Sequence, residues 1–147
     1  MRHSHKSNQL IKETVFLDTD VILDLLTERE PYFKPAVDLF LLIQNKSIEA
    51  YTSPVVIANL FYILRRHFDK NKAIQSLKKL KSLVKILNCG DHVIELALSS
   101  DFTDFEDSIQ YYTALESNID VLITRNIKDY KTANINISTP LEYIGKQ

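Results

Sequence analysis

The first acidic residue of interest in this sequence follows a short apolar run. Residues 14–17 favour a β-strand and lead directly into Asp18, and from Val21 the apolar spacing becomes that of a short helix. Asp18 is therefore expected where a buried strand meets a helix. An unpaired carboxylate in that position would cost several kcal/mol, so it must be paired or must hold a cation. Open α/β sheets also bind their ligands at this edge.

Two other segments carry polar side chains that a parallel sheet would bring close to Asp18. Asp104, Glu106 and Asp107 lie in the first turn of a predicted helix. Residues 124–129 follow a predicted strand directly. Carboxylates in one crevice repel by roughly 4 kcal/mol per pair at about 4 Å and an effective dielectric constant near 20, and a divalent cation would remove that cost. Oxygen ligands without a suitable cysteine or histidine favour Mg²⁺ or Mn²⁺, which support in-line phosphoryl displacement.

Several of these acids also have an ordinary structural interpretation. Residues 103–106 match a capping box, and acids in a first turn are favoured by the helix dipole by about 0.3 to 1 kcal/mol. Asp20 is interpreted as the N-cap of the helix after the first strand, and Asp24 as an exposed residue of that helix. Asp18 has no comparable structural role, and Asp107 lies deeper in its helix.

A predicted helix over residues 55–66 is mostly apolar and is expected to be central and well buried. Asn59 is its polar exception. With Tyr62 and Arg66 it forms an i, i+3, i+7 row along one face. This row is either a narrow edge that faces solvent or the border of the crevice. In the second case, Asn59 would hold a water on the metal and Arg66 would contact a phosphate.

The elements that must position these side chains alternate between strands and helices. This alternation predicts an α/β fold with a central, mostly parallel sheet of about five strands, covered by helices on both faces. The 147 residues suffice for one domain, expected over residues 13–147 after a flexible tail, residues 1–12. Strands are predicted over residues 14–17, 48–52, 83–87, 120–124 and 134–138, and helices over 21–27, 35–43, 55–66, 70–82, 91–98 and 101–116, with a last helical turn from Pro140.

Composition excludes several classes of protein. The net charge of −1 gives no general attraction to a polyanion, and two glycines cannot build a glycine-rich phosphate loop. The single cysteine, Cys89, excludes an internal disulfide. No apolar run approaches the roughly 20 residues that span a bilayer, and the polar N-terminus does not match a secretory signal. A cytoplasmic protein with no membrane partner is expected.

Four segments together resemble the PIN-domain family, in particular its VapC-like ribonuclease toxins: residues 15–24, residues 52–54 at the start of an apolar helix, residues 104–110, and residues 123–130. The similarity covers roughly residues 14–144 in the right order. It implies a Rossmann-like three-layer α/β/α domain and a Mg²⁺- or Mn²⁺-dependent endoribonuclease that hydrolyses RNA phosphodiester bonds. It also implies three partners, namely an RNA substrate, a cognate antitoxin and a second copy of the chain.

The resemblance also suggests which residues form the site. The first and third acids of the family fall on Asp18 and Asp107, whereas Asn59 and Asn126 stand where carboxylates are common. An amide adds no negative charge, so one weakly bound ion is expected rather than a pair, with nearby acids such as Glu106 compensating. The expected residues are, for catalysis, Asp18, Asn59, Asp107 and Asn126; for metal binding, Asp18, Asp104, Asp107 and Asp129; and for substrate binding, Arg66, Thr124 and Arg125.

Two alternatives stay open. The two amides and the net charge favour a PIN-fold module that has lost cleavage and binds RNA or a protein. Residues 18–21 also resemble the nucleophile motif of haloacid-dehalogenase-like phosphatases, with Asp18 phosphorylated and Asp20 as general acid. Ile22 breaks that pattern, and the chain lacks the length and the glycines that such enzymes use for a cap and loops.

Overall fold

A single parallel sheet organises the molecule. The structure, a computed structural model, describes residues 11–130 and 134–147, so the predicted tail, residues 1–12, lies almost wholly outside the described residues. The strands follow the order β3-β2-β1-β4-β5, and every neighbouring pair is parallel, which confirms the predicted sheet. Their bounds are Thr14–Leu17 (β1), Glu49–Thr52 (β2), Lys85–Ile86 (β3), Val121–Ile123 (β4) and Asn136–Ser138 (β5).

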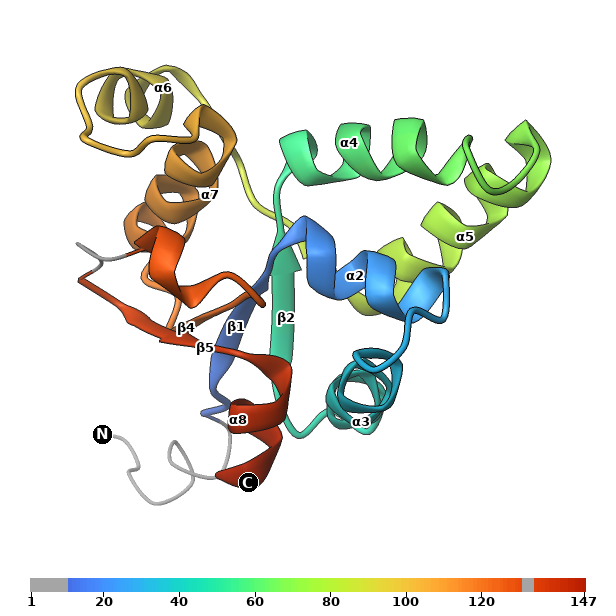
Figure 1. Cartoon of the computed structure of the whole chain (residues 1–147). Coiled ribbons are helices and arrows are strands. Elements are labelled where there is room, and N and C mark those ends of the chain that lie inside the picture. Colours follow the sequence, from blue (N-terminus) through green and yellow to red (C-terminus); the bar gives the residue numbers. More distant parts are fainter. Residues whose placement is uncertain (1–10, 131–133) are drawn as a thin grey trace.

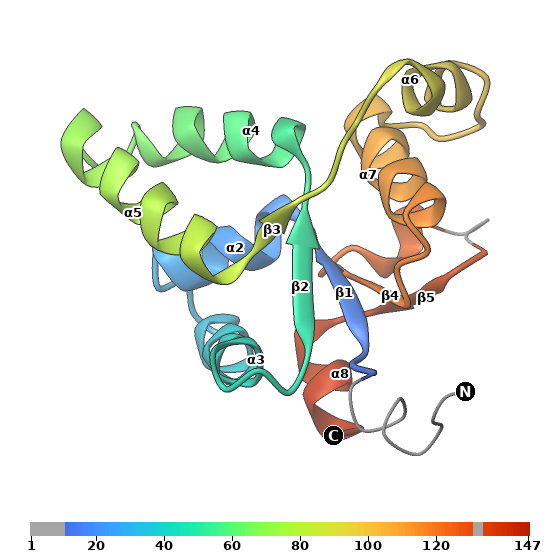
Figure 2. The same ribbon diagram turned by 180° about the vertical axis from the view of Figure 1, so that it is seen from behind.

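Helices cover both faces of this sheet. Helices α2 and α3 lie on one side and α6 and α7 on the other, as both views show (Figures 1 and 2), so the predicted three-layer α/β/α arrangement is confirmed. No helix in the described part of the chain is both long and apolar enough to cross a membrane. The helices are Thr19–Leu26 (α2), Phe33–Gln44 (α3), Pro54–Leu64 (α4), Lys70–Leu83 (α5), Asp91–Leu98 (α6), Phe105–Glu116 (α7) and Pro140–Gly145 (α8), with a 3₁₀ turn at Ile127–Tyr130 (η1).

Strand β1 is the centre of the sheet and of the core. Val15, Phe16 and Leu17 are fully buried, because β1 pairs with β2 on one side and β4 on the other and is covered on both faces. Burial on both faces explains an apolar run without alternation. The chain leaves β1 towards β2 on one side and later returns to place β4 on the other. Asp18 therefore lies at the point where the strand order reverses, which is where such sheets bind ligands.

Helix α4 departs from the sequence prediction. Its start is as expected, because the Ser53 hydroxyl accepts a hydrogen bond from the Val56 N–H and Pro54 occupies the first turn. The predicted central, well-buried position is wrong. Only one face is buried, through Val56, Leu60 and Leu64, whereas Tyr62 is 69% exposed. Helices α4 and α5 extend together beyond the sheet (Figure 1).

Two helix caps also differ from the predictions. The residue that caps α2 is Asp18, whose carboxylate accepts from the Thr19 N–H, and Asp20 lies in the first turn. Helix α7 is capped by Asp104, which accepts from the Asp107 N–H at 3.0 Å, so the capping box predicted over residues 103–106 is not formed. Both caps therefore use an acid that the sequence had singled out for chemistry.

Candidate active site

Asp18 is held at the end of β1 by neutral donors. Its side chain is buried, with one oxygen 2.7 Å from the Thr19 N–H and the other 2.8 Å from the Thr124 hydroxyl. The Tyr130 hydroxyl also donates to it, at 3.2 Å. Burial raises the pKa of Asp18, and these hydrogen bonds oppose the rise. Within residues 11–130 and 134–147, no basic side chain pairs with Asp18, so its charge is uncompensated.

Asp107 reaches the same place from the first turn of α7. One of its oxygens lies 3.4 Å from the Tyr130 hydroxyl, which also contacts Asp18. Partial burial, followed by the charges of Asp18 and Asp104, raises the pKa of Asp107 to about 7. The structure therefore brings Asp18 and Asp107 to the same hydroxyl, at the edge of the sheet where the sequence placed both.

Tyr130 is the residue that the sequence reasoning missed. Its ring is buried, and its hydroxyl lies between two carboxylates although it has only one hydrogen to donate. Burial and the charges of Asp18 and Asp107 raise the pKa of Tyr130 far above its usual value, so the phenol stays neutral. The sequence signal was its place directly after Asp129 in the acidic segment that follows β4.

A pocket of about 210 Å³ opens beside these carboxylates. Three buried oxygens that line it have no hydrogen-bond partner among the described residues: Thr19 Oγ1, Asp20 Oδ1 and Gln110 Oε1. Buried oxygens without a donor require a ligand or water, and hard cations are bound by such oxygens. The full lining is Asp18, Thr19, Asp20, Leu23, Asp104, Glu106, Asp107, Gln110 and Asn126. We call it the acidic pocket.

The two amides predicted for the site each hold a carboxylate of the acidic pocket. The Asn59 amide donates to Glu106, and the Asn126 amide donates to Asp20 Oδ2 at 3.1 Å. Burial and the charge of Asp18 raise the pKa of Asp20 to about 7. Neither amide adds a negative charge to the pocket. Each instead holds a neighbouring carboxylate there, Glu106 or Asp20.

The three residues predicted to bind substrate, Arg66, Thr124 and Arg125, do not line the acidic pocket. Thr124 is fully buried; its hydroxyl donates to Asp18 and accepts from the Asn126 N–H at 3.1 Å. Direct contact between Thr124 and a substrate does not fit this position, and the observed contacts orient Asp18. Arg66 follows the C-terminal end of α4 and does not line the acidic pocket. Asp129 lines an adjoining cavity of about 450 Å³, which shares Asp104 and Asp107 with the acidic pocket.

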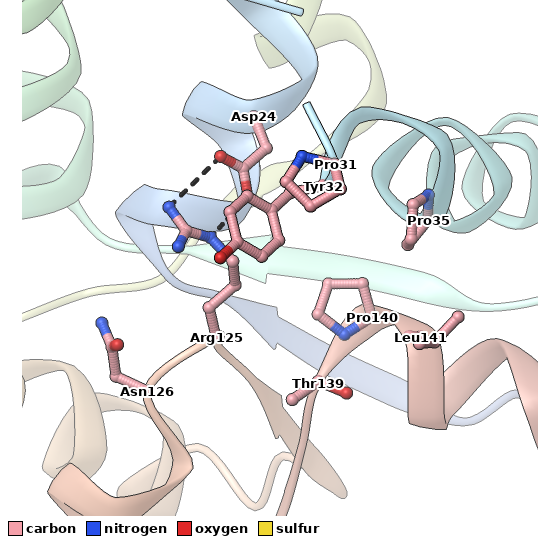
Figure 3. Close-up of a pocket in the computed structure, with 9 residues that line it drawn as sticks. All are labelled: Asp24, Pro31, Tyr32, Pro35, Arg125, Asn126, Thr139, Pro140 and Leu141. Atoms are coloured by element: carbon pink, nitrogen blue, oxygen red, sulfur yellow. Dashed lines mark hydrogen bonds and ion pairs between the residues drawn. The ribbon is translucent and has the colours of Figure 1, made fainter. Parts of the chain in front are cut away.

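Arg125 forms an ion pair with Asp24. Its guanidinium donates to both oxygens of Asp24, at 2.7 and 3.3 Å, and lies 3.9 Å from the centre of the Tyr32 ring (Figure 3). Arg29 lies 3.9 Å from the same carboxylate. Asp24 is 1% exposed, so its predicted exposed position is wrong. The partner that permits this burial lies 101 residues further along the chain.

Comparisons with known proteins agree with this architecture. The PIN domain family matches residues 14–128, so the chain belongs to that family. It is similar to the ribonuclease VapC1 of Aquifex aeolicus (strain VF5), with 27% identity over 136 residues that cover 89% of this chain and 93% of that protein.

Solved structures share the fold. VapBC from Salmonella typhimurium, a DNA-bound complex, matches with a TM-score of 0.66 and 17% identity over 87% of this chain and 98% of the other. The sarcin-ricin loop cleaving toxin VapC20 of Mycobacterium tuberculosis matches with a TM-score of 0.59 and 17% identity over 74% and 86% of the two chains.

Proposed function

We propose that this protein is a Mg²⁺- or Mn²⁺-dependent endoribonuclease that hydrolyses RNA phosphodiester bonds as the toxin of a toxin–antitoxin pair in the cytoplasm. The observation that carries the proposal is the approach of Asp18 and Asp107, from opposite halves of the chain, to one hydroxyl beside a pocket, with no basic partner among the residues that the structure describes. Membership of the PIN domain family and similarity to a ribonuclease support it.

The residues around the acidic pocket fit one hard cation rather than two. Asp18 and Asp107 would hold it directly, whereas Asp104 and Asp129, which line the adjoining cavity, would act through water molecules bound to the ion. No group of three or more acidic, histidine or cysteine side chains within the described ranges is arranged to hold a metal, so water must complete the coordination, as Mg²⁺ commonly requires. When bound, the ion would generate the nucleophile from water and stabilise charge on the phosphoryl group.

The other predicted site residues and Tyr130 would orient the carboxylates of the pocket. Thr124 and Tyr130 orient the carboxylate of Asp18 through hydrogen bonds to the same oxygen. Asn59 and Asn126 would act through Glu106 and Asp20, which they hold at the pocket. Glu106 and Asp20 would thereby give the pocket the negative charge that the two amides do not supply.

Cleavage by the full chain tests the proposal. Structured RNA and tRNA are incubated with Mn²⁺ and wild-type protein or Asp18→Asn, and the products are mapped. Specific cuts that require Mn²⁺ and disappear in Asp18→Asn are expected. RNA binding by both proteins without any cut would contradict the enzyme.

A binding module without cleavage is the second candidate. The observation that favours it is that the carboxylates at the acidic pocket are not arranged as a metal-holding group of three or more among residues 11–130 and 134–147. Such a module would bind RNA or a protein equally well in EDTA and in Mn²⁺. The enzyme, in contrast, would show a rise in melting temperature with Mn²⁺ that is lost in Asp18→Asn.

The proposed partners follow from the relatives. Neighbours in fold include a VapBC complex, which supports a cognate antitoxin, and a homodimer is proposed as well. Growth arrest on expression, relieved by co-expression of the protein encoded next to this one, would support the toxin role. Growth unaffected by wild type would contradict it.

A further inference from the structure

A second pocket, drawn in Figure 3, shares Asn126 with the acidic pocket but has a more apolar lining. It has a volume of about 400 Å³, within the usual range of roughly 300 to 1,000 Å³ for ligand sites. Its walls come from the start of α3 and the start of α8, where three prolines and Leu141 supply apolar surface. Its polar groups include the Arg125 guanidinium, the Asp24 carboxylate and the Asn126 amide. We call it the proline pocket.

The charge in the proline pocket disfavours a phosphate as its main ligand. Arg125 is the basic residue of the lining, and its charge is matched by Asp24, to which it donates two hydrogen bonds. A guanidinium has five N–H donors, so three are left for another acceptor. A neutral group with hydrogen-bond acceptors therefore fits this pocket better than an anion.

The shape of the lining favours a flat ligand. The Tyr32 ring lies against the Arg125 guanidinium and is 41% exposed, and Leu141 is 69% exposed at the opposite wall. Unpaired RNA bases stack on aromatic rings and guanidinium planes in this way. Guanine also presents two acceptors, O6 and N7, that suit the free N–H groups of an arginine.

The two pockets share a wall. Asn126 lines both, and the Arg125 N–H and the Asn126 amide both donate to Asp20 in the acidic pocket. We propose that the proline pocket binds an unpaired base, preferentially guanine, of a nucleotide next to the phosphodiester that is cut. Because it names a subsite for the RNA, this inference rests on the proposed function.

A binding experiment without cleavage tests the pocket directly. GMP, AMP, CMP, UMP and inorganic phosphate are titrated separately into the full chain in EDTA and followed by NMR. Saturable binding of GMP, tighter than that of the other nucleotides and of phosphate, is expected. Tyr32→Ala should weaken it by about fivefold or more, since a base stack contributes at least that much. Tyr62→Ala, which removes an exposed tyrosine from α4, is the matched control and should bind as wild type.

A second variant covers the case in which Tyr32→Ala unfolds. Leu141→Glu changes an exposed side chain at the wall and should weaken GMP binding without lowering the melting temperature. Phosphate binding as tightly as GMP, no GMP binding, or wild-type binding by a folded Leu141→Glu protein would each overturn the inference.

Cleavage mapping separates this inference from the proposed function. On an RNA that contains every dinucleotide, wild-type cuts should cluster beside guanine, and Leu141→Glu should lose that preference. An unchanged preference would overturn the base subsite while leaving the nuclease intact. If the wild type makes no cut, the nuclease proposal fails, and the GMP titration still decides whether the pocket holds a base.

Discussion

Asp18 at the start of α2 and Asp24 near its end are both buried, but they differ in the groups that contact their carboxylates. Asp24 is 1% exposed and is paired with Arg125, with Arg29 nearby. Asp18 is 6% exposed, and its hydrogen-bond donors in the described part of the chain are all neutral, among them Thr124. Burial raises the pKa of both, but only for Asp24 does a guanidinium oppose it. Removing one partner of a buried ion pair destabilises the fold, whereas a buried carboxylate without a paired cation is suited to bind a ligand.

The largest effect is expected from Asp18→Asn. If Asp18 holds the ion, cleavage of RNA in Mn²⁺ should fall by roughly a thousandfold, which corresponds to about 4 kcal/mol of barrier. The melting temperature in EDTA should stay the same or rise, because an uncompensated buried charge is removed. Rates from single-turnover cleavage and melting curves measure the two effects. A large fall in stability would show that Asp18 is structural like Asp24.

Asp24→Ala should produce the reverse pattern. It leaves the Arg125 guanidinium without its carboxylate, and breaking a buried pair costs about 3 to 5 kcal/mol. Urea unfolding measures this loss. The matched control is Asp38→Ala, which breaks an i,i+4 pair with the exposed Lys34 and should cost less than about 1 kcal/mol. Equal stability of the two variants would remove the distinction between Asp24 and a surface acid.

The dependence of stability on pH also tests the difference between carboxylates with and without a basic partner. The pKa values of Asp20 and Asp107 are raised to about 7 from an ordinary 3.8, so the folded protein binds protons more tightly than the unfolded chain. In EDTA, the contribution of these two raised pKa values to the free energy of unfolding is full below about pH 4. It is lost as the pH rises through about 7. The melting temperature should therefore be lower at pH 8 than at pH 5, with a smaller difference in Asp107→Asn. Mn²⁺ should raise it more at pH 8, and a melting temperature independent of pH and Mn²⁺ would contradict this.

The smallest effect is expected from Tyr130→Phe. It removes the hydroxyl between Asp18 and Asp107 but keeps the buried ring. One hydrogen bond to a charged group contributes about 1.5 kcal/mol, so cleavage should fall about tenfold while the melting temperature changes little. The ratio of rates at saturating Mn²⁺ measures it. A loss as large as that of Asp18→Asn would mean that the hydroxyl takes part in the chemistry.

Local sequence patterns were sufficient to predict the central part of the fold. The apolar run before Asp18 and the one before Thr124 became β1 and β4, because strands buried on both faces need continuous apolar residues. The start of a helix at Ser53–Pro54 was also predicted correctly. Helix α4 misled the prediction, since apolar composition indicates a buried face but not whether another element covers the opposite one.

Only part of the candidate site could be predicted from the sequence. The approach of Asp18 and Asp107 followed from strand ends meeting at one edge of a parallel sheet. The pairing of Asp24 with Arg125 did not, because the two residues are 101 positions apart and no local spacing relates them. Which acid caps a helix also depends on backbone geometry, so Asp18 rather than Asp20 caps α2.

Three consecutive residues after β4 each contact a different part of the turn and helix after β1. Thr124 donates to Asp18, Arg125 to Asp24, and Asn126 to Asp20. A point substitution in this tripeptide would disturb one of these bonds. An insertion or deletion of one residue would misalign all three at once, so the spacing between β4 and η1 should tolerate changes of side chain far better than changes of length.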